Sequence, residues 1–124
     1  MNKTAIQKNG HAIADIMSGE PLNTDVQSAL DLLMTARREL GADRILLNKA
    51  CVCEDFFILS TGLAGEILQK CINYGYGTKL GVYGDYSRYT SKPLHDFLYE
   101  SNQGEDFFFT KAREEALQKL SNTR

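Results

Sequence analysis

Two short segments near the start of the chain alternate between apolar and polar residues, which is the pattern of half-buried strands. They span residues 4–8 and 11–16 and flank the pair Asn9-Gly10. Asn-Gly supplies the positive φ angles of a type I′ turn, whose twist matches that of two antiparallel strands. The sequence therefore predicts a β-hairpin at the N-terminus.

The next segment has the helical period, with apolar residues every three or four positions from about residue 25 to 40. Thr24 and Gln27 fit a capping box at its start, because the Thr hydroxyl can accept from an amide three residues on while the Gln side chain reaches back. Gly41 suits the residue after a helix end. The predicted buried face consists of Val26, Ala29, Leu30, Leu33 and Leu40.

Three short apolar runs of strand length follow, at residues 44–47, 78–83 and 106–110. Buried strands that alternate with helices are the signature of parallel β-α-β units. The remaining helices are expected at about 60–75, from Ser91 with Pro93 in the first turn, and at about 111–120. Their predicted buried residues are Leu63, Ala64, Ile67, Leu68, Cys71, Ile72, Leu94, Phe97, Leu98, Ala112, Ala116, Leu117 and Leu120.

This order of elements predicts a single α/β domain over residues 1–124: a small sandwich with helices over a mixed five-stranded sheet that is mostly parallel. A doubly wound nucleotide fold is less expected, because such folds usually begin with a parallel β-α unit that carries the phosphate turn. The segment Gly75–Gly81 superficially resembles a dinucleotide fingerprint. It stands ahead of a strand and has one residue too many before its last glycine, so we interpret it as a turn that ends a helix.

Composition and charge narrow the classes of partner. The 124 residues are 43% hydrophobic, which is enough apolar material for a core without a metal or disulfide. Their net charge is −2. Scattered Lys and Arg argue against a nucleic-acid partner. No apolar stretch approaches the roughly 18–20 residues of a membrane span, and no apolar run follows Lys3, so we expect a cytoplasmic protein with no membrane partner.

The cysteines and histidines predict neither a metal site nor a cofactor. Cys51 and Cys53 form a C-x-C pair too tight for a routine disulfide, and with Cys71 the number is odd, so free thiols are expected. The only histidines, His11 and His95, lie in unrelated segments without metal-ligand spacing.

Two loops are the candidate ligand sites, because each leads from a predicted strand into a helix N-terminus at the carboxyl edge of the sheet. Hydroxyls and cations at such positions suit an anion. The competing interpretation is that the hydroxyl residues are helix caps and the carboxylates are solvated. The candidate ligand residues are Glu54, Asp55, Asp85, Tyr86, Arg88, Ser91 and Lys92.

Aromatic residues crowd the same regions. Phe56-Phe57 and the run 107–109 are expected in the core. Tyr83, Tyr86 and Tyr89 fit either the rim of the core or a partner surface.

The hairpin, the amphipathic helix and the turn Ser60-Thr61-Gly62-Leu63 that opens a second helix resemble the STAS domain, the anti-sigma-factor antagonist fold. This resemblance places Thr61 at the regulatory phosphoacceptor position and Ser60 before it, while Leu59 replaces the usual acidic residue. The run from about Gly41 onward, including E-D-F-F, S-T-G-L-A-G-E-I-L-Q-K and Y-T-S-K-P-L, resembles an uncharacterised bacterial family of unknown function, which is expected to adopt a STAS-like fold.

Two functional hypotheses follow. The first is a non-enzymatic STAS-like interaction and regulatory module, which binds a protein partner through Ser60, Thr61 and Gly62 and through a polar helix face made of Glu66, Gln69, Lys70 and Asn73. The alternative is a small-ligand or catalytic pocket between the two loops at 54–62 and 85–92. The edge strand 4–8 has a Lys but no Pro to prevent edge pairing, so we also expect a homodimer.

Overall fold

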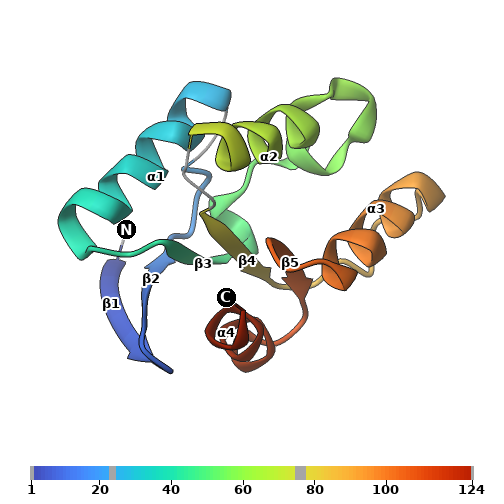
Figure 1. Cartoon of the computed structure of the whole chain (residues 1–124). Helices are drawn as coiled ribbons and strands as arrows, with labels where there is room; N and C mark the ends of the chain where they lie inside the picture. The colour runs from blue at the N-terminus through green and yellow to red at the C-terminus, as the bar shows by residue number, and fades with distance from the viewer. Residues whose placement is uncertain (1, 23–24, 75–77, 124) are drawn as a thin grey trace.

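The computed structural model describes residues 2–22, 25–74 and 78–123, without the side chains of Cys71 and Tyr74. It contains one mixed five-stranded sheet with the strand order β1-β2-β3-β4-β5, which confirms the predicted α/β class (Figure 1). β1 and β2 are antiparallel, and every later neighbour is parallel. The strands are β1 (Asn2–Lys8), β2 (His11–Met17), β3 (Arg44–Asn48), β4 (Lys79–Tyr83) and β5 (Phe107–Thr110).

The N-terminal hairpin forms as predicted. Lys8 pairs with His11 across a two-residue turn, in which Asn9 has φ 54° and Gly10 has φ 80°. Two positive φ angles in a row define the type I′ geometry that follows the right-handed twist of the strands.

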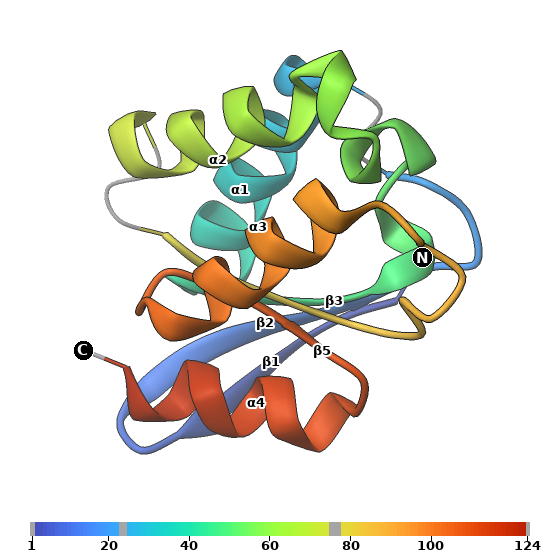
Figure 2. The ribbon, with the colours of Figure 1, turned by 90° about the vertical axis from the view of Figure 1, so that its right-hand side faces the viewer.

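Four α-helices in the described residues cover the sheet, at α1 (Val26–Leu40), α2 (Leu63–Tyr74), α3 (Lys92–Gln103) and α4 (Arg113–Asn122). Figure 2 shows α1, α2 and α3 on one face and α4 on the other. Each β-α-β connection moves one strand over in the same direction, and such connections are right-handed, so their helices lie on the same face. The parallel strands therefore have no point at which their order reverses, which is where doubly wound sheets open a ligand crevice.

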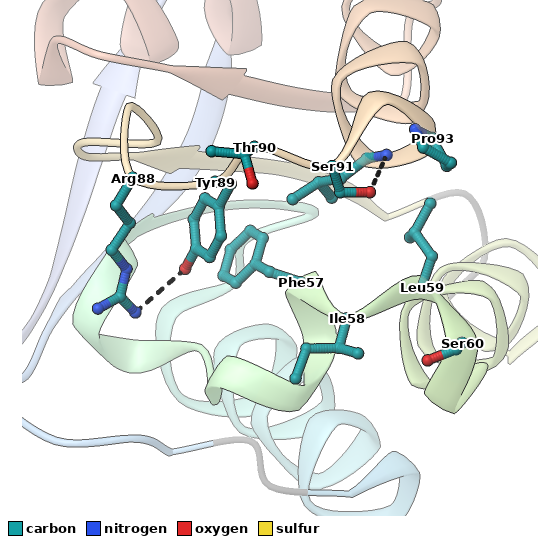
Figure 3. Close-up of a pocket in the computed structure, with 10 residues that line it drawn as sticks. Phe57, Ile58, Leu59, Ser60, Arg88, Tyr89, Thr90, Ser91 and Pro93 are labelled. Atoms are coloured by element: carbon teal, nitrogen blue, oxygen red, sulfur yellow. Dashed lines mark hydrogen bonds between the residues drawn. The ribbon is translucent and has the colours of Figure 1, made fainter.

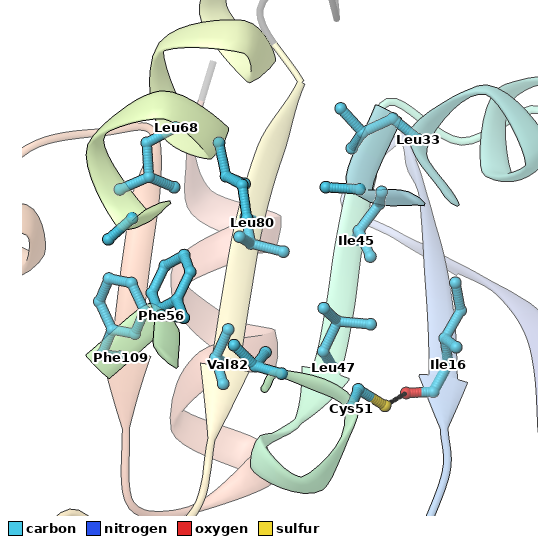
Figure 4. Packing of buried hydrophobic residues seen from close by; sticks show 14 of the residues in the cluster. Ile16, Leu33, Ile45, Leu47, Cys51, Phe56, Leu68, Leu80, Val82 and Phe109 are labelled. Atoms are coloured by element: carbon cyan, nitrogen blue, oxygen red, sulfur yellow. Dashed lines mark hydrogen bonds between the residues drawn. The ribbon is translucent and has the colours of Figure 1, made fainter. Parts of the chain in front are cut away.

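The two faces carry separate cores. The larger core contains Ile16, Ile45, Leu47, Val82 and Phe109 under α1–α3 (Figure 4), and the smaller one packs Ile13, Leu46 and Phe108 under α4. Adjacent strand residues thus point to opposite cores, which explains why these strands are almost continuously apolar. Of the predicted core residues, Leu33, Ile67 and Leu117 are buried, while Leu30, Leu63 and Phe97 are half-buried.

The cap of α1 differs from the prediction. Asp25 is the N-cap: its carboxylate accepts from the Ser28 amide at 2.7 Å, and the Ser28 hydroxyl accepts from the Asp25 amide at 3.1 Å. The side chain of Gln27 donates to Asp31 instead, because the helix begins one residue later than a Thr24 cap requires. Thr24 itself lies outside the described residues.

Two predicted buried positions are exposed. Ala112 precedes α4 in an extended conformation, so it does not share the inward face of the helix, which begins at Arg113. Ile72 is 47% exposed in the last turn of α2, whereas the described side chains that this helix buries, Ala64, Ile67 and Leu68, lie in its first two turns. The predicted helix end at Gly75 and the rest of the segment 75–77 lie outside the described residues.

None of the helices in the described part of the chain has the length and apolar character needed to span a bilayer.

Candidate functional site

The two predicted loops meet at the carboxyl edge of the sheet and enclose an open groove of about 470 Å³. One wall is the segment 57–60, and the other runs from Arg88 to Leu94 (Figure 3). Six of the ten lining residues are apolar or aromatic; the full set is Phe57, Ile58, Leu59, Ser60, Arg88, Tyr89, Thr90, Ser91, Pro93 and Leu94. We refer to this feature as the groove.

The first wall belongs to a segment that follows β3 as three short 3₁₀ turns, Lys49–Cys51, Glu54–Phe57 and Leu59–Thr61. Phe56 and Phe57 anchor it, since both rings are buried and pack edge to face at 5.1 Å. With these two rings in the core, the next side chain is directed outward, and Ile58 is 49% exposed. The predicted burial of Phe56-Phe57 is therefore confirmed, and its consequence is an exposed isoleucine at the groove.

The second wall is held by tyrosines. Tyr86 points into the core, where its hydroxyl donates to the Val82 carbonyl at 2.7 Å and burial raises the pKa of the phenol strongly. Tyr89 stacks on Phe57 with ring centroids 5.2 Å apart. Ser91 caps α3 by accepting from the Leu94 amide at 3.3 Å. Tyr86 thus belongs to the core, while Tyr89 forms the contact between the walls. Of Tyr86, Tyr89 and Ser91, the last two line the groove.

Glu54 connects the two walls. Its carboxylate accepts from the Tyr89 hydroxyl at 2.7 Å and forms ion pairs with Arg88 and, at 3.5 Å, with Lys49. Partial burial by itself would raise the pKa of this carboxyl, but the hydrogen bond from Tyr89 and the charges of Lys49 and Arg88 lower the pKa below its ordinary value. The structure therefore joins two of the predicted ligand residues, Glu54 and Arg88, to each other.

Lys49 contacts an aromatic ring from each wall. Its ammonium lies 5.0 Å from the Phe57 ring centroid and 4.8 Å from that of Tyr89, within the range of cation–π attraction. Gly84 makes room for it, because a Cβ at that position would lie 2.5 Å from Lys49 Cβ. Lys49 was not predicted, and its only sequence signal is a cation that directly follows an apolar strand.

Ser60, Thr61 and Gly62 lie immediately before α2, and their hydroxyls differ in environment. The Thr61 hydroxyl lies 2.9 Å from the Asp55 carbonyl and 2.8 Å from the Ile58 carbonyl, and it accepts from the Leu63 amide at 3.2 Å. The Ser60 hydroxyl has no hydrogen-bond partner among the described residues, and Ser60 lines the groove. Gly62 has φ 75°, which lets the chain turn into the helix.

The predicted polar face of α2 points away from the sheet. Glu66, Gln69 and Asn73 are exposed and Lys70 is half-buried. Gln69 donates to Asn73 at 3.1 Å along the helix. This face continues from the turn at Ser60 but is not part of the groove.

Five of the seven predicted ligand residues lie outside the groove lining: Glu54 and Tyr86, described above, and Asp55, Asp85 and Lys92. Asp55 is exposed. The Asp85 carboxylate accepts from the Ser87 amide at 2.9 Å, and hydrogen bonding with the side chain and then the amide of Ser87 lowers the pKa of this carboxyl. Lys92 pairs with Asp96 at 2.9 Å along α3. These short-range contacts hold the side chains to their own loop or helix.

An ion pair with a buried carboxylate on the α4 face was not predicted. Asp15 on β2 is 8% exposed and pairs with Arg113 at 2.5 Å. Burial and the nearby charge of Asp15 raise the pKa of Tyr83, whose hydroxyl has no hydrogen-bond partner among the described residues. A charged residue inside the apolar strand His11–Met17 was the available signal. The pair joins the N-terminal end of α4 to the sheet.

Neither a metal site nor a disulfide is found in the described residues. Cys51 and Cys53 are free thiols, and no group of three or more potential metal ligands gathers within the part of the chain that is described.

A search of curated proteins and a search of solved structures found no match to this chain. The model of one protein family matches residues 8–120, which is nearly all of the sequence and includes both walls of the groove. The chain therefore belongs to the family described as "Domain of unknown function (DUF4180)".

Proposed function

We propose that this protein is a non-enzymatic, STAS-like regulatory module that binds a protein partner at the groove. The resemblance to STAS domains in the turn before α2 is supported by the N-terminal hairpin, the sequential strand order and the three crossover helices on one face. Because a fold alone does not determine a function, the proposal depends on the surface at the carboxyl edge of the sheet.

The half-exposed Ile58 beside an apolar groove is the observation that carries the proposal. Phe57, Leu59, Pro93 and Leu94 form apolar walls that would accept an aliphatic side chain. Tyr89 and Arg88 at one end belong to the residue types enriched in binding hot spots. An open, apolar groove with a polar rim has the anatomy of a protein-binding patch.

The free hydroxyl of Ser60 makes it the better candidate for regulation than Thr61, although the STAS resemblance points to Thr61. Phosphorylation of Thr61 would remove the hydrogen that its hydroxyl donates to the Asp55 and Ile58 carbonyls. A phosphate on Ser60 would disturb no hydrogen bond among the described residues, and it would add about two negative charges at the groove. The polar face of α2 would then extend the binding surface beyond Ser60.

Ile58→Asp tests the proposal, with Ile72→Asp as a matched control. The two isoleucines are 49% and 47% exposed, but only Ile58 lines the groove. Immobilised wild type, Ile58→Asp and Ile72→Asp are compared for proteins captured from the native cell extract by quantitative mass spectrometry. We expect at least one protein to bind wild type and Ile72→Asp equally and Ile58→Asp at least tenfold less. Equal capture by all three would reject the groove as the binding site.

A small-ligand pocket is the second candidate, because about 470 Å³ lies within the range of roughly 300–1,000 Å³ typical of ligand sites. Thermal-shift screening of phosphates, nucleotides and carboxylates distinguishes the two candidates. A ligand at 100 times its dissociation constant stabilises the protein by about 2.7 kcal/mol. A shift that Ser91→Ala or Arg88→Gln abolishes would favour the small ligand, and no shift across the screen would favour the protein partner.

A further inference from the structure

The outer edge of β1 has backbone groups available for pairing. The turn at Asn9-Gly10 has two residues, so the closing pair Lys8–His11 exchanges both of its backbone hydrogen bonds. These hydrogen-bonded pairs alternate along an antiparallel ladder. The amide and carbonyl groups of Lys3, Ala5 and Gln7 therefore point away from β2, and none of them has a partner among the described residues.

The opposite edge of the sheet is closed. β5 has only four residues, and the Asn102 side chain on α3 bonds to both the amide and the carbonyl of Phe109. β1 has seven residues, no proline and no bulge, and its side chains are exposed apart from the half-buried Lys3 and Ile6. Long, regular edges of this kind pair with other strands unless something covers them.

We propose that two copies of this chain pair through β1, antiparallel and about a twofold axis at Ala5, so that their sheets form one continuous ten-stranded sheet. The occupant is a second copy because β1 is complementary to itself. In this register all seven residues overlap, and the outward groups of Lys3, Ala5 and Gln7 meet those of Gln7, Ala5 and Lys3 in the second copy.

Charge supports the same register. Lys3 lies opposite Gln7 and Lys8 lies opposite Asn2, so no like charges face each other. A shift that centres the axis on Lys3 would oppose two lysines and shorten the overlap. The small side chain of Ala5 at the axis avoids a clash between identical side chains. The inference does not depend on the groove, and most of β1 lies outside the residues 8–120 matched by the family model.

Sedimentation and cysteine cross-linking test the interface. At micromolar concentration we expect twice the mass of one 13.9 kDa chain. The Cα atoms of a hydrogen-bonded antiparallel pair are about 5.5 Å apart, within disulfide range, so Ala5→Cys should oxidise to a covalent dimer. A cysteine at position 4 would lie opposite Ile6 of the second copy, more than about 7 Å from the cysteine at position 4 of that copy. Thr4→Cys should therefore remain monomeric on denaturing gels, as should wild type.

Ala5→Lys supplies a test that does not depend on oxidation. It places two like charges opposite each other at the axis, so it should raise the dimer dissociation constant at least tenfold, whereas Thr4→Lys should leave it nearly unchanged. Thermal unfolding checks that both variants are folded. A wild-type mass of one chain without concentration dependence overturns the proposal. A dimer in which Thr4→Cys cross-links as readily as Ala5→Cys, or in which Ala5→Lys has no effect, overturns it as well.

Discussion

The side-chain amide of Asn102 on α3 pairs with both backbone groups of Phe109 on β5, donating to its carbonyl at 3.0 Å and accepting from its amide at 2.7 Å. The side chain thus takes the place of a sixth strand at that edge of the sheet. It also fixes α3, whose first turn forms part of the groove, to the last strand.

We expect Asn102→Leu to lower the free energy of unfolding by at least about 1 kcal/mol, because it leaves the amide and carbonyl of the buried Phe109 without this partner. An unpaired buried backbone group costs about 1–3 kcal/mol. Gln103→Leu on the same helix is exposed and should stay within about 0.5 kcal/mol of wild type. Urea unfolding of the two variants measures the difference. Equal stability of both would mean that the edge does not need this cover.

Arg44 holds the C-terminal end of α4 on the sheet. Its side chain is buried, and it donates to the Leu120 carbonyl at 2.7 Å and to the Thr123 carbonyl at 2.8 Å. Hydrogen bonds from charged groups contribute about 1.5–3 kcal/mol each, so Arg44→Met should destabilise the protein by about 3 kcal/mol or more.

Hydrogen exchange locates the effect of Arg44. In Arg44→Met the amides of α4 should lose protection before those of α1. Arg38→Met, at an exposed position on α1, is the control and should leave both helices protected. Uniform loss of protection throughout the sheet would contradict a local role at α4.

Gly62 and Gly65 should respond in opposite directions to alanine, although an added Cβ has open space at both. Gly62 has φ 75°, a conformation that costs an L-residue about 1–2 kcal/mol, so Gly62→Ala should destabilise by about that amount. Gly65 lies inside α2, where alanine is favoured over glycine by about 0.5–1 kcal/mol, so Gly65→Ala should stabilise. Thermal unfolding of the two variants decides the signs, and stabilisation by Gly62→Ala would contradict the described turn.

The connection between the groove walls should open in acid. The folded protein lowers the pKa of Glu54 from its ordinary value of 4.5, so it favours the carboxylate. The contribution of this contact is present above the ordinary pKa and is lost as the pH falls through the lowered value. Amides at 84–91 should then exchange faster, after correction for intrinsic rates, below the lowered pKa than at pH 7.

Glu54→Gln should remove this acid dependence and exchange rapidly at both pH values. Asp55→Asn changes a neighbouring exposed carboxylate that forms no ion pair among the described residues, so it should keep the wild-type pH profile. If Asp55→Asn loses the acid dependence while Glu54→Gln retains it, the contact assigned to Glu54 is wrong.

Local patterns in the sequence determined the order of elements. The Asn9-Gly10 hairpin, the helices around Leu33 and Ile67 and the strands at 44–47 and 78–83 were predicted and are confirmed, because turn chemistry and apolar period act over a few residues. Helix starts were less accurate. Asp25, next to Thr24, is also a suitable N-cap residue for α1, and the start of α4 depends on where β5 ends.

Tertiary structure decided which polar residues meet. The sequence identified both loops, but the pairing of Glu54 with Arg88 and Tyr89 brings together side chains more than thirty residues apart in the chain. The same holds for Asp15 with Arg113. Asn102 and Phe109 are only seven residues apart, but the Asn102 side chain reaches the Phe109 backbone only because α3 packs beside β5. Periodicity shows which face of an element is buried, whereas the partner of a polar side chain is set by the three-dimensional arrangement of the sheet and its helices.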